Sequence, residues 1–262
     1  LILLNIYQKI VRKISNLFSS KIIYFKEFPY MPDENYPAKL DFEFQKYLFD
    51  KFSFGTSNRL YPGVTYNNLD SILYSLYSKS ERFNFLDFGA RNIDHYCHLN
   101  KNISNINYFY HDLPQYNETI HQLKKEKNIQ NLNIINSIEL LESIELDFIF
   151  LGSVLQYIKD YKSLLSKLFN LNADYFFLAG QICYEKKIEN KDVFFFKQLN
   201  SLPQINYGQA FHYDSLIQLF SENGWKLITK SLNKTDKHLN FNHISKKYGK
   251  IDNLDFFFEK KS

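Results

Sequence analysis

Between residues 83 and 181 the sequence alternates short apolar runs with amphipathic stretches, and this alternation constrains the fold more than any other feature. The apolar runs are "FNFLDF" (83–88), "INYFYHD" (106–112), "LNIIN" (132–136), "LDFIFLGS" (146–153) and "DYFFLAGQ" (174–181). Because they are apolar on both faces, they are typical of parallel strands that helices cover on each side. The stretches at 95–99, 116–127 and 161–171 predict those helices.

The flanking segments predict an extension before this unit and two further strands after it. Residues 1–60 read as a helical and irregular extension, and a helix at 66–77 opens the domain that runs from 61 to 262. Near the other end, 211–225 predicts a helix ending at Gly224. The runs 226–232 and 254–261 predict two late strands. We expect these two strands to form an antiparallel pair that completes the parallel sheet.

Composition is that of a globular protein and restricts the partners. The chain has 262 residues, 45% apolar and 23% charged, which suits one large domain with an elaboration. Its net charge of +4 comes from scattered lysines, whereas nucleic-acid binders concentrate Lys and Arg on one face, so we expect no nucleic-acid partner. Cys97 and Cys183 lack disulfide or metal spacing and predict buried thiols in a cytoplasmic protein.

The first segment, "LILLNIYQKIVRKISNLF", has the periodicity of an amphipathic helix. Its unbroken apolar part is too short to span a bilayer, and no small-residue cleavage site follows it. We expect this helix to pack on its own domain, with a partner or a membrane surface as the alternative. Monomer and homodimer are both compatible with the sequence.

Polar residues follow the apolar runs, where ligands bind in doubly wound sheets. Asp87, Gly89, Ala90 and Arg91 come at the end of the first run, and Gly89 permits a tight turn. Asp112 ends the second run, 25 residues after Asp87 (112 − 87). An acid about 20 residues past a glycine loop is the usual partner of ribose hydroxyls, so this spacing predicts a nucleoside-type cofactor.

The first loop lacks the later glycines of dinucleotide sites, because Arg91 and residues near Asp94 stand in their places. Dinucleotide folds need those glycines so that the pyrophosphate can approach a helix N-terminus. S-adenosyl-L-methionine (SAM) has no phosphate, and its loop therefore tolerates larger residues. The loop thus favours SAM over NAD or FAD.

The segments "FLDFGARNIDHY", "YHDLP" and "DFIFLGSVLQYIKDYKSLLSKL", in this order, resemble a family of SAM-dependent methyltransferases assigned from bacterial surface-polysaccharide clusters (O-antigen and capsule). "VFFFKQ" and "YDSLIQLFSENGW" extend the resemblance, which covers roughly residues 60–230. Leu-Gln-Tyr is its most specific element, while Ala90 and Ile93 depart from positions near which the family has glycine. It implies an α/β, Rossmann-like class I methyltransferase fold: a mostly parallel seven-stranded sheet with flanking helices and a helical N-terminal extension over the active site.

The resemblance also implies roles for individual residues. Asp87, Gly89, Ala90 and Arg91 would border the methionine part of SAM, and Asp112 and Leu113 would hold its ribose and adenine. Asn136 follows the third strand and completes the expected cofactor set. Ser153 and Gln156 would lie under the methyl-donor end, with capping of the following helix as their alternative role.

Methyl transfer to a hydroxyl needs positioning and can need a base. His212 is the first candidate base, with capping of a helix as its alternative role. His111 is the second, and its place inside a strand favours a structural role. The expected acceptor-lining residues are Tyr61, Tyr157, Gln181, Gln198 and Tyr213. We expect no metal site, because His238, His243 and Asp236 lie in a polar loop without a second cluster.

The sequence therefore predicts a SAM-dependent O-methyltransferase. By the resemblance, its acceptor would be an oxygen on a capsule or other surface-polysaccharide precursor, a sugar hydroxyl or a phosphate-type modifying group, with S-adenosylhomocysteine (SAH) as the product. Two alternatives stay open. One is another Rossmann-type nucleotide-sugar enzyme, although its Tyr-x-x-x-Lys spacing is missing after the fourth strand. The other is a catalytically degenerate methyltransferase fold that acts as a binding or scaffold protein.

Overall fold

The computed structural model describes residues 23–31, 42–54, 69–77, 82–103, 105–198, 206–233 and 239–261. Seven of its strands form the sheet that the sequence predicts. They are β2 (Phe83–Phe88), β3 (Ile106–His111), β4 (Leu132–Ile135), β5 (Leu146–Gly152), β6 (Ala173–Tyr184), β9 (Trp225–Leu232) and β11 (Ile251–Lys260). Their order is β4–β3–β2–β5–β6–β11–β9. The first five are parallel, and β11 runs antiparallel to both β6 and β9.

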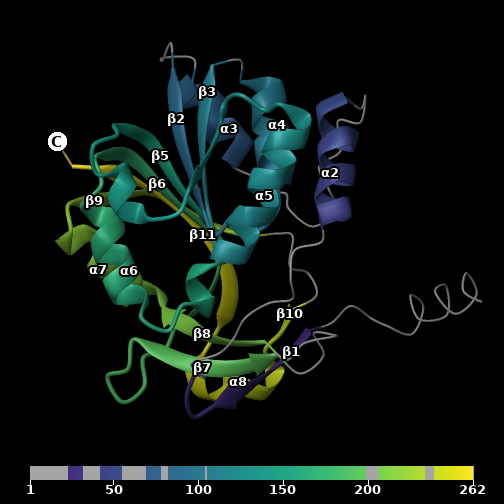
Figure 1. Ribbon diagram of the computed structural model, residues 1–262. Helices are drawn as coiled ribbons and strands as arrows, with labels where there is room; N and C mark the ends of the chain where they lie inside the picture. The colour runs from purple at the N-terminus through teal and green to yellow at the C-terminus, as the bar shows by residue number, and fades with distance from the viewer. Residues whose placement is uncertain are drawn as a thin grey trace, which may run out of the picture.

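Helices cover both faces of this sheet (Figure 1). One face carries α2 (Phe42–Phe54), α3 (Leu69–Tyr77), α4 (Asp94–Asn102) and α5 (Pro114–Lys127). The other carries α6 (Tyr161–Phe169), α7 (Tyr213–Glu222) and the 3₁₀ turns η1 (Ile138–Leu141) and η2 (Leu155–Tyr157). Since both faces are buried, nearly every residue of the central strand β5 is inaccessible, which is why its sequence lacks polar alternation.

A second group of strands extends the sheet on the carboxyl side of the parallel strands (Figure 1). It consists of β1 (Ile23–Phe28), β7 (Val193–Gln198), β8 (Tyr207–His212) and β10 (Leu239–Asn240), with α8 (Asn242–Tyr248) packed against it. The last residues of β6 join the two groups, because Cys183 and Tyr184 pair with Phe211 and His212 of β8. The part of the sheet that the structure describes thus has eleven strands.

Several predicted boundaries change. The helix predicted at 211–225 begins only at Tyr213, because Phe211 and His212 complete β8. The strand predicted at 174–181 continues to Tyr184, and "VFFFKQ" is the strand β7. Inside the expected helical and irregular extension, Ile23–Phe28 is a strand that pairs with β7 and β10.

The rest of the extension is described only in part. The predicted amphipathic helix at the start of the chain lies outside the described residues. Helix α2 packs on α4 and α5, on one face of the sheet. That the extension covers the active site stays a prediction. Among the described helices, none is long and apolar enough to cross a membrane.

Candidate functional site

The loop after β2 requires its glycine. Gly89 has a φ of +72°, where residues with a side chain are strained, and a Cβ there would lie 2.8 Å from the Cβ of Val154. Its N–H donates to the carbonyl of His111 at 2.8 Å. The glycine therefore lets the loops after β2, β3 and β5 meet at one edge of the sheet.

Asp112 joins the first two of these loops. Its Oδ2 accepts from the N–H of Arg91 at 2.6 Å, and its Oδ1 from the N–H of Leu113 at 2.7 Å. Arg91 itself has a φ of +52°, and its carbonyl accepts from the Tyr110 hydroxyl at 3.1 Å. Burial raises the pKa of Asp112 to about 6, although the two backbone N–H groups favour its ionised form. Each carboxylate oxygen keeps further acceptor capacity.

Asp87 lies below this loop and is inaccessible to solvent. Its Oδ2 accepts from the Tyr108 hydroxyl and lies 3.3 Å from Nδ1 of His95. Burial alone lowers the pKa of His95, but the hydrogen bond and charge of Asp87 outweigh it and raise that pKa above its ordinary value. The roles of Tyr108 and His95 were not predicted from the sequence, because their contacts with Asp87 depend on how β3 and α4 pack against β2.

The carboxyl ends of β3 and β4 are tied together by one amide. Asn117 of α5 accepts from the N–H of Asp112 at 3.1 Å and donates to Oδ1 of Asn136 at 3.0 Å. His111 donates through Nδ1 to the carbonyl of Ile135 at 2.7 Å, and burial lowers its pKa, which favours the neutral ring. We call the set of Asp87, Asp112 and the 89–91 loop the carboxylate centre.

Glutamine amides gather instead around the turn η2, and we call Gln156, Gln181, Gln198 and Gln209 the amide centre. Gln156 accepts through Oε1 from the N–H of Ile182 at 3.3 Å. Gln209 donates to the carbonyl of Ile158 at 2.6 Å. Thus the Leu-Gln-Tyr element is held by β6 and β8 rather than exposed.

Two of the expected acceptor-lining residues meet in the amide centre. Gln198 donates to the Tyr157 hydroxyl at 3.2 Å. Gln181 is buried and donates to the carbonyl of Ala179 at 2.7 Å. Gln181 and Gln209 each donate Nε2 to a backbone carbonyl, and this contact defines which end of the amide is the oxygen. Their Oε1 atoms point away from those carbonyls and have no described partner.

Ser153 stands between the two centres. It has a φ of +56°, and its N–H donates to the carbonyl of Ala179 at 2.8 Å. Its hydroxyl fills the space where a Cβ on Gly180 would lie. Gly180 in turn donates to Oδ1 of Asp255 at 2.7 Å, a buried acid of β11 that the sequence did not indicate.

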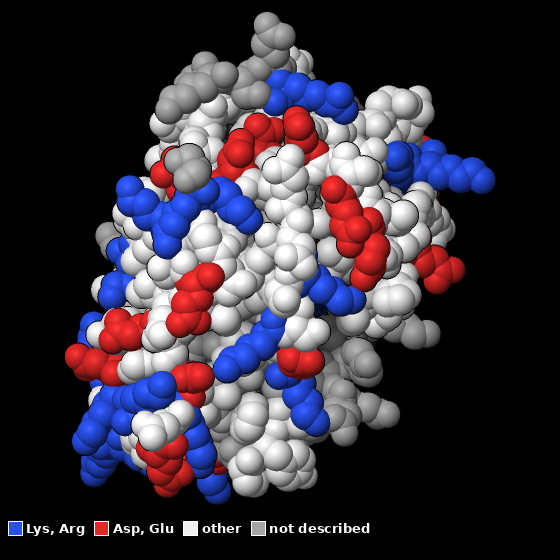
Figure 2. Space-filling view, turned by 90° about the vertical axis from the view of Figure 1, so that its left-hand side faces the viewer, with Lys and Arg blue, Asp and Glu red and all other residues white. Residues whose placement is uncertain are grey.

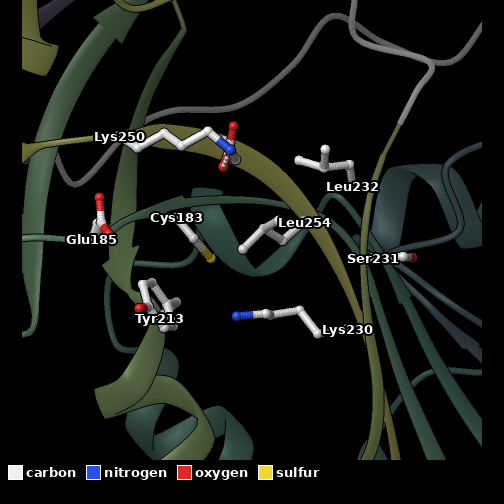
Figure 3. A pocket seen from close by; sticks show the side chains of 9 residues that line it. Cys183, Glu185, Tyr213, Lys230, Ser231, Leu232, Lys250 and Leu254 are labelled. Atoms are coloured by element: carbon white, nitrogen blue, oxygen red, sulfur yellow. Dashed lines mark ion pairs between the residues drawn. The ribbon is translucent and has the colours of Figure 1, made fainter.

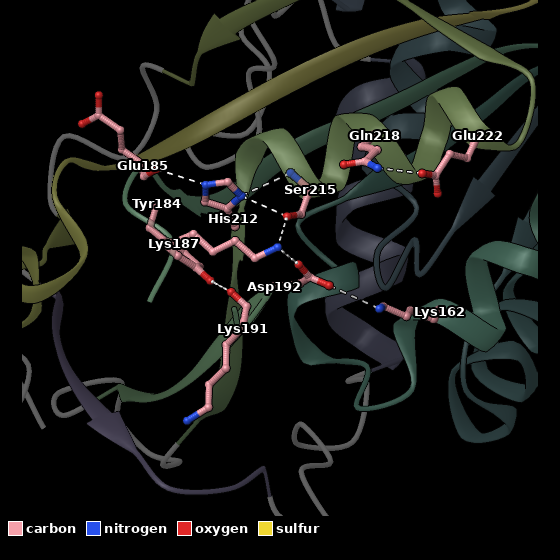
Figure 4. Close-up of polar contacts among 10 residues, drawn as sticks. All are labelled: Lys162, Tyr184, Glu185, Lys187, Lys191, Asp192, His212, Ser215, Gln218 and Glu222. Atoms are coloured by element: carbon pink, nitrogen blue, oxygen red, sulfur yellow. Dashed lines mark hydrogen bonds and ion pairs between the residues drawn. The ribbon is translucent and has the colours of Figure 1, made fainter. Parts of the chain in front are cut away.

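His212 caps α7 (Figure 4). Its Nδ1 accepts from the N–H of Ser215 at 3.3 Å, and its Nε2 lies 3.1 Å from the carbonyl of Glu185. These partners define the tautomer: Nε2 carries the proton and the lone pair of Nδ1 is occupied. The capping role is present, while proton abstraction by His212 stays a prediction.

Tyr213 lies apart from these centres, because it follows His212 and borders a separate cavity. Tyr61, His238 and Asp236 fall outside the described residues. Within the described part of the chain, no group of three or more His, Cys, Asp or Glu side chains is arranged to hold a metal ion. On the face in Figure 2, basic and acidic side chains lie intermixed.

Comparison with known proteins identifies the fold. No protein-family model matches the sequence, and no curated protein matches it. Among solved structures, the N-terminal domain of EvdMO1 with SAH bound has a TM-score of 0.53 at 9% identity, covering 84% of this chain and 96% of that one.

Two further structures agree. A SAM-dependent methyltransferase from Clostridium acetobutylicum has a TM-score of 0.50 at 8% identity, covering 84% of this chain and 99% of that one. The 1,6-didemethyltoxoflavin-N1-methyltransferase from Burkholderia thailandensis was solved with 1,6-didemethyltoxoflavin and SAH bound. It has a TM-score of 0.50 at 13% identity, covering 88% of this chain and 94% of that one. The chain therefore has the Rossmann-like class I methyltransferase fold, which confirms the predicted fold class.

Proposed function

We propose that this chain binds SAM at the carboxylate centre and transfers its methyl group to an acceptor that enters beside the amide centre. The observation that carries the proposal is the Asp112 carboxylate, fixed by Arg91 and Leu113 at the carboxyl end of β3. A carboxylate in that place can accept from both hydroxyls of a ribose.

The start of α4 supports SAM over a dinucleotide. Gln45 of α2 accepts through Oε1 from the N–H of Ile93 at 3.1 Å and donates to Oδ1 of Asn92 at 3.1 Å. A pyrophosphate needs free N–H groups at that helix end, and here a buried amide already uses one. A cofactor without phosphate needs none of them.

The roles proposed for individual residues follow from these contacts. Gly89, Ala90 and Arg91 would border the methionine part, with Asp87 supporting the loop from below, while Asp112, Leu113 and Asn136 would hold the nucleoside. Bound SAM supplies an electrophilic methyl group, and the contribution of this chain is to position the acceptor oxygen in line with it. Ser153 and Gln156 would order the loop next to that carbon.

For the acceptor we propose an oxygen of a capsule or other surface-polysaccharide precursor. Support comes from the resemblance of the "GSVLQY" region, from the amide of Gln198 that donates to the Tyr157 hydroxyl, and from the Gln181 oxygen that has no described partner. The similar structures contain different small molecules, among them the EvdMO1 domain studied in the presence of SAH and D-fucose, so the proposed acceptor rests on the resemblance of the sequence. His212 would have to release Ser215 before it could accept a proton.

Isothermal titration calorimetry tests the cofactor directly. We expect SAM and SAH to bind and NAD not to bind. Binding of NAD alone would favour a nucleotide-sugar enzyme, and binding of none of the three would favour a scaffold protein. If SAM binds, incubation with methyl-labelled SAM and nucleotide-linked sugars should place label on the sugar.

A further inference from the structure

A cavity of about 280 Å³ lies on the α7 side of the sheet, away from the loops after β2 and β3. Its walls come from the end of β6, the end of β9, the start of β11 and the first residue of α7 (Figure 3). Its lining includes the side chains of Cys183, Glu185, Tyr213, Lys230, Asp252 and Leu254. The volume lies just below the usual range for ligand pockets, which restricts the ligand to a small molecule.

The cavity contains one positive charge that has no carboxylate partner. Lys230 extends from β9 toward Tyr213, with its Nζ 4.4 Å from the ring centroid, and forms no ion pair with any described residue (Figure 3). The other lysine of the lining, Lys250, is neutralised by Asp252 at 2.7 Å. Lys230 is exposed, and its contact with the aromatic ring keeps the ammonium at the mouth of the cavity without neutralising it.

The other walls provide apolar contact and a hydrogen-bond acceptor. Leu254 and the thiol of Cys183 form the floor, and burial raises the pKa of that thiol well above its ordinary value, so it remains uncharged. The carboxylate of Glu185, which forms no ion pair in the described chain, stands at the rim, where it can accept from a hydroxyl.

We propose that this cavity binds a small anionic group attached to a hydroxyl-bearing body, such as a phosphorylated or carboxylated monosaccharide. Lys230 binds the anion, Tyr213 and Leu254 contact the body, and Glu185 accepts from a hydroxyl. The inference does not depend on SAM binding, because the residues involved are separate from the carboxylate centre.

Calorimetric titrations with D-glucuronate, D-glucose 6-phosphate, inorganic phosphate and D-glucose, at constant ionic strength, test it. We expect the two acidic sugars to bind at least tenfold more tightly than D-glucose. Lys230→Gln should weaken them about tenfold, the effect of losing one charge-assisted contact. Lys226→Gln is the matched control, an exposed lysine on the same strand that does not line the cavity, and should change affinity less than twofold.

Glu185→Gln adds an independent readout. It should lower the affinity for the acidic sugars, whose hydroxyl loses its carboxylate acceptor. It should lower the affinity for inorganic phosphate by no more than twofold. The proposal is wrong if neither acidic sugar binds, if Lys230→Gln binds them as the wild type does, or if Lys226→Gln loses as much. SAH titration of Lys230→Gln should match the wild type, which separates this result from that of the proposed function.

Discussion

The carboxylate centre and the amide centre lie at the same edge of the sheet, yet they are built from different chemistry. In the first, the acids Asp87 and Asp112 are held by backbone N–H groups, a tyrosine hydroxyl and a histidine. In the second, neutral amides hold neutral carbonyls and a backbone N–H. Changes in pH and in loop geometry should therefore affect ligand binding and stability at the carboxylate centre. At the amide centre, stability should depend mainly on individual hydrogen bonds.

This difference in chemistry is consistent with the proposed function, in which the carboxylate centre binds the cofactor and the acceptor enters beside the amide centre. A cofactor with a fixed nucleoside needs a rigid carboxylate at one defined position. The methyl acceptor of the proposed function would meet uncharged amides that offer hydrogen bonds. The two centres meet at Ser153, whose backbone follows β5 and whose hydroxyl contacts Gly180 of β6. Four changes test the comparison, from the largest expected effect to the smallest.

Gly89→Ala should have the largest effect, a loss of about 2–5 kcal/mol in the free energy of unfolding, measured by urea denaturation. About 1–2 kcal/mol comes from the left-handed backbone and about 1–3 kcal/mol from forcing a methyl group against Val154. Gly224→Ala is the matched control, because Gly224 has a φ of +82° but no atom within 4 Å of its Cβ position. Equal losses for the two variants would show that the contact with Val154 is unimportant.

Asp112→Ala should weaken SAH binding at least tenfold, or about 1.4 kcal/mol, because a hydrogen-bonded carboxylate is lost. Calorimetry measures the change. Asp174→Ala controls for removal of an acid, since Asp174 lies at the opposite end of its strand and is exposed. Unchanged affinity in Asp112→Ala would mean that the ribose does not bind at Asp112.

The parallel strands and the position of Asp112 could be predicted because both follow from local pattern. Runs such as "LDFIFLGS" are apolar on both faces, which is typical of buried parallel strands. In a doubly wound sheet, an acid at the end of the strand after a glycine loop lies next to that loop. The contacts of Gln45 with Ile93 and of Gly180 with Asp255 could not be predicted. They join residues 48 and 75 positions apart, so only the packing of whole elements brings them together.

The strands β7 and β8 were missed for a different reason. Val193–Gln198 alternates half-buried and buried side chains and is rich in Val and Phe, a signal that does favour a strand. In β8, Phe211 and His212 precede a helix without a break, and the histidine reads as part of that helix because it caps it. The sequence pattern was therefore sufficient to predict β7 as a strand. The boundary between β8 and α7 at His212 could not be predicted, because it depends on a capping contact.

Acidification should weaken SAH binding to the wild type by about tenfold between pH 7 and pH 5, because the pKa of Asp112 is raised to about 6 and only its carboxylate accepts from both hydroxyls. For unfolding the sign is opposite. The folded pKa lies above the ordinary 3.8, so Asp112 stabilises the fold at acidic pH, and that contribution is lost as the pH rises from about 4 to about 6.

Calorimetry at several pH values checks the binding half of this prediction, with Asp112→Asn as the control because an amide does not titrate. The pH dependence should disappear in that variant. An equal pH dependence in Asp112→Asn would assign the titration to another group, with His95 beside Asp87 as the first candidate.

Gln209→Leu should have the smallest effect, a loss of about 1 kcal/mol in the free energy of unfolding, because the carbonyl of Ile158 loses its donor. Removal of the Gln209 oxygen, which has no described partner, offsets part of that loss. Urea denaturation at pH 5 and at pH 7 should give the same change, since no titrating group takes part. Gln218→Leu on the exposed side of α7 should stay within about 0.5 kcal/mol of the wild type. A loss in Gln209→Leu that differs between the two pH values would show that the amide centre is coupled to the carboxylate centre, and the two could no longer be treated as chemically separate.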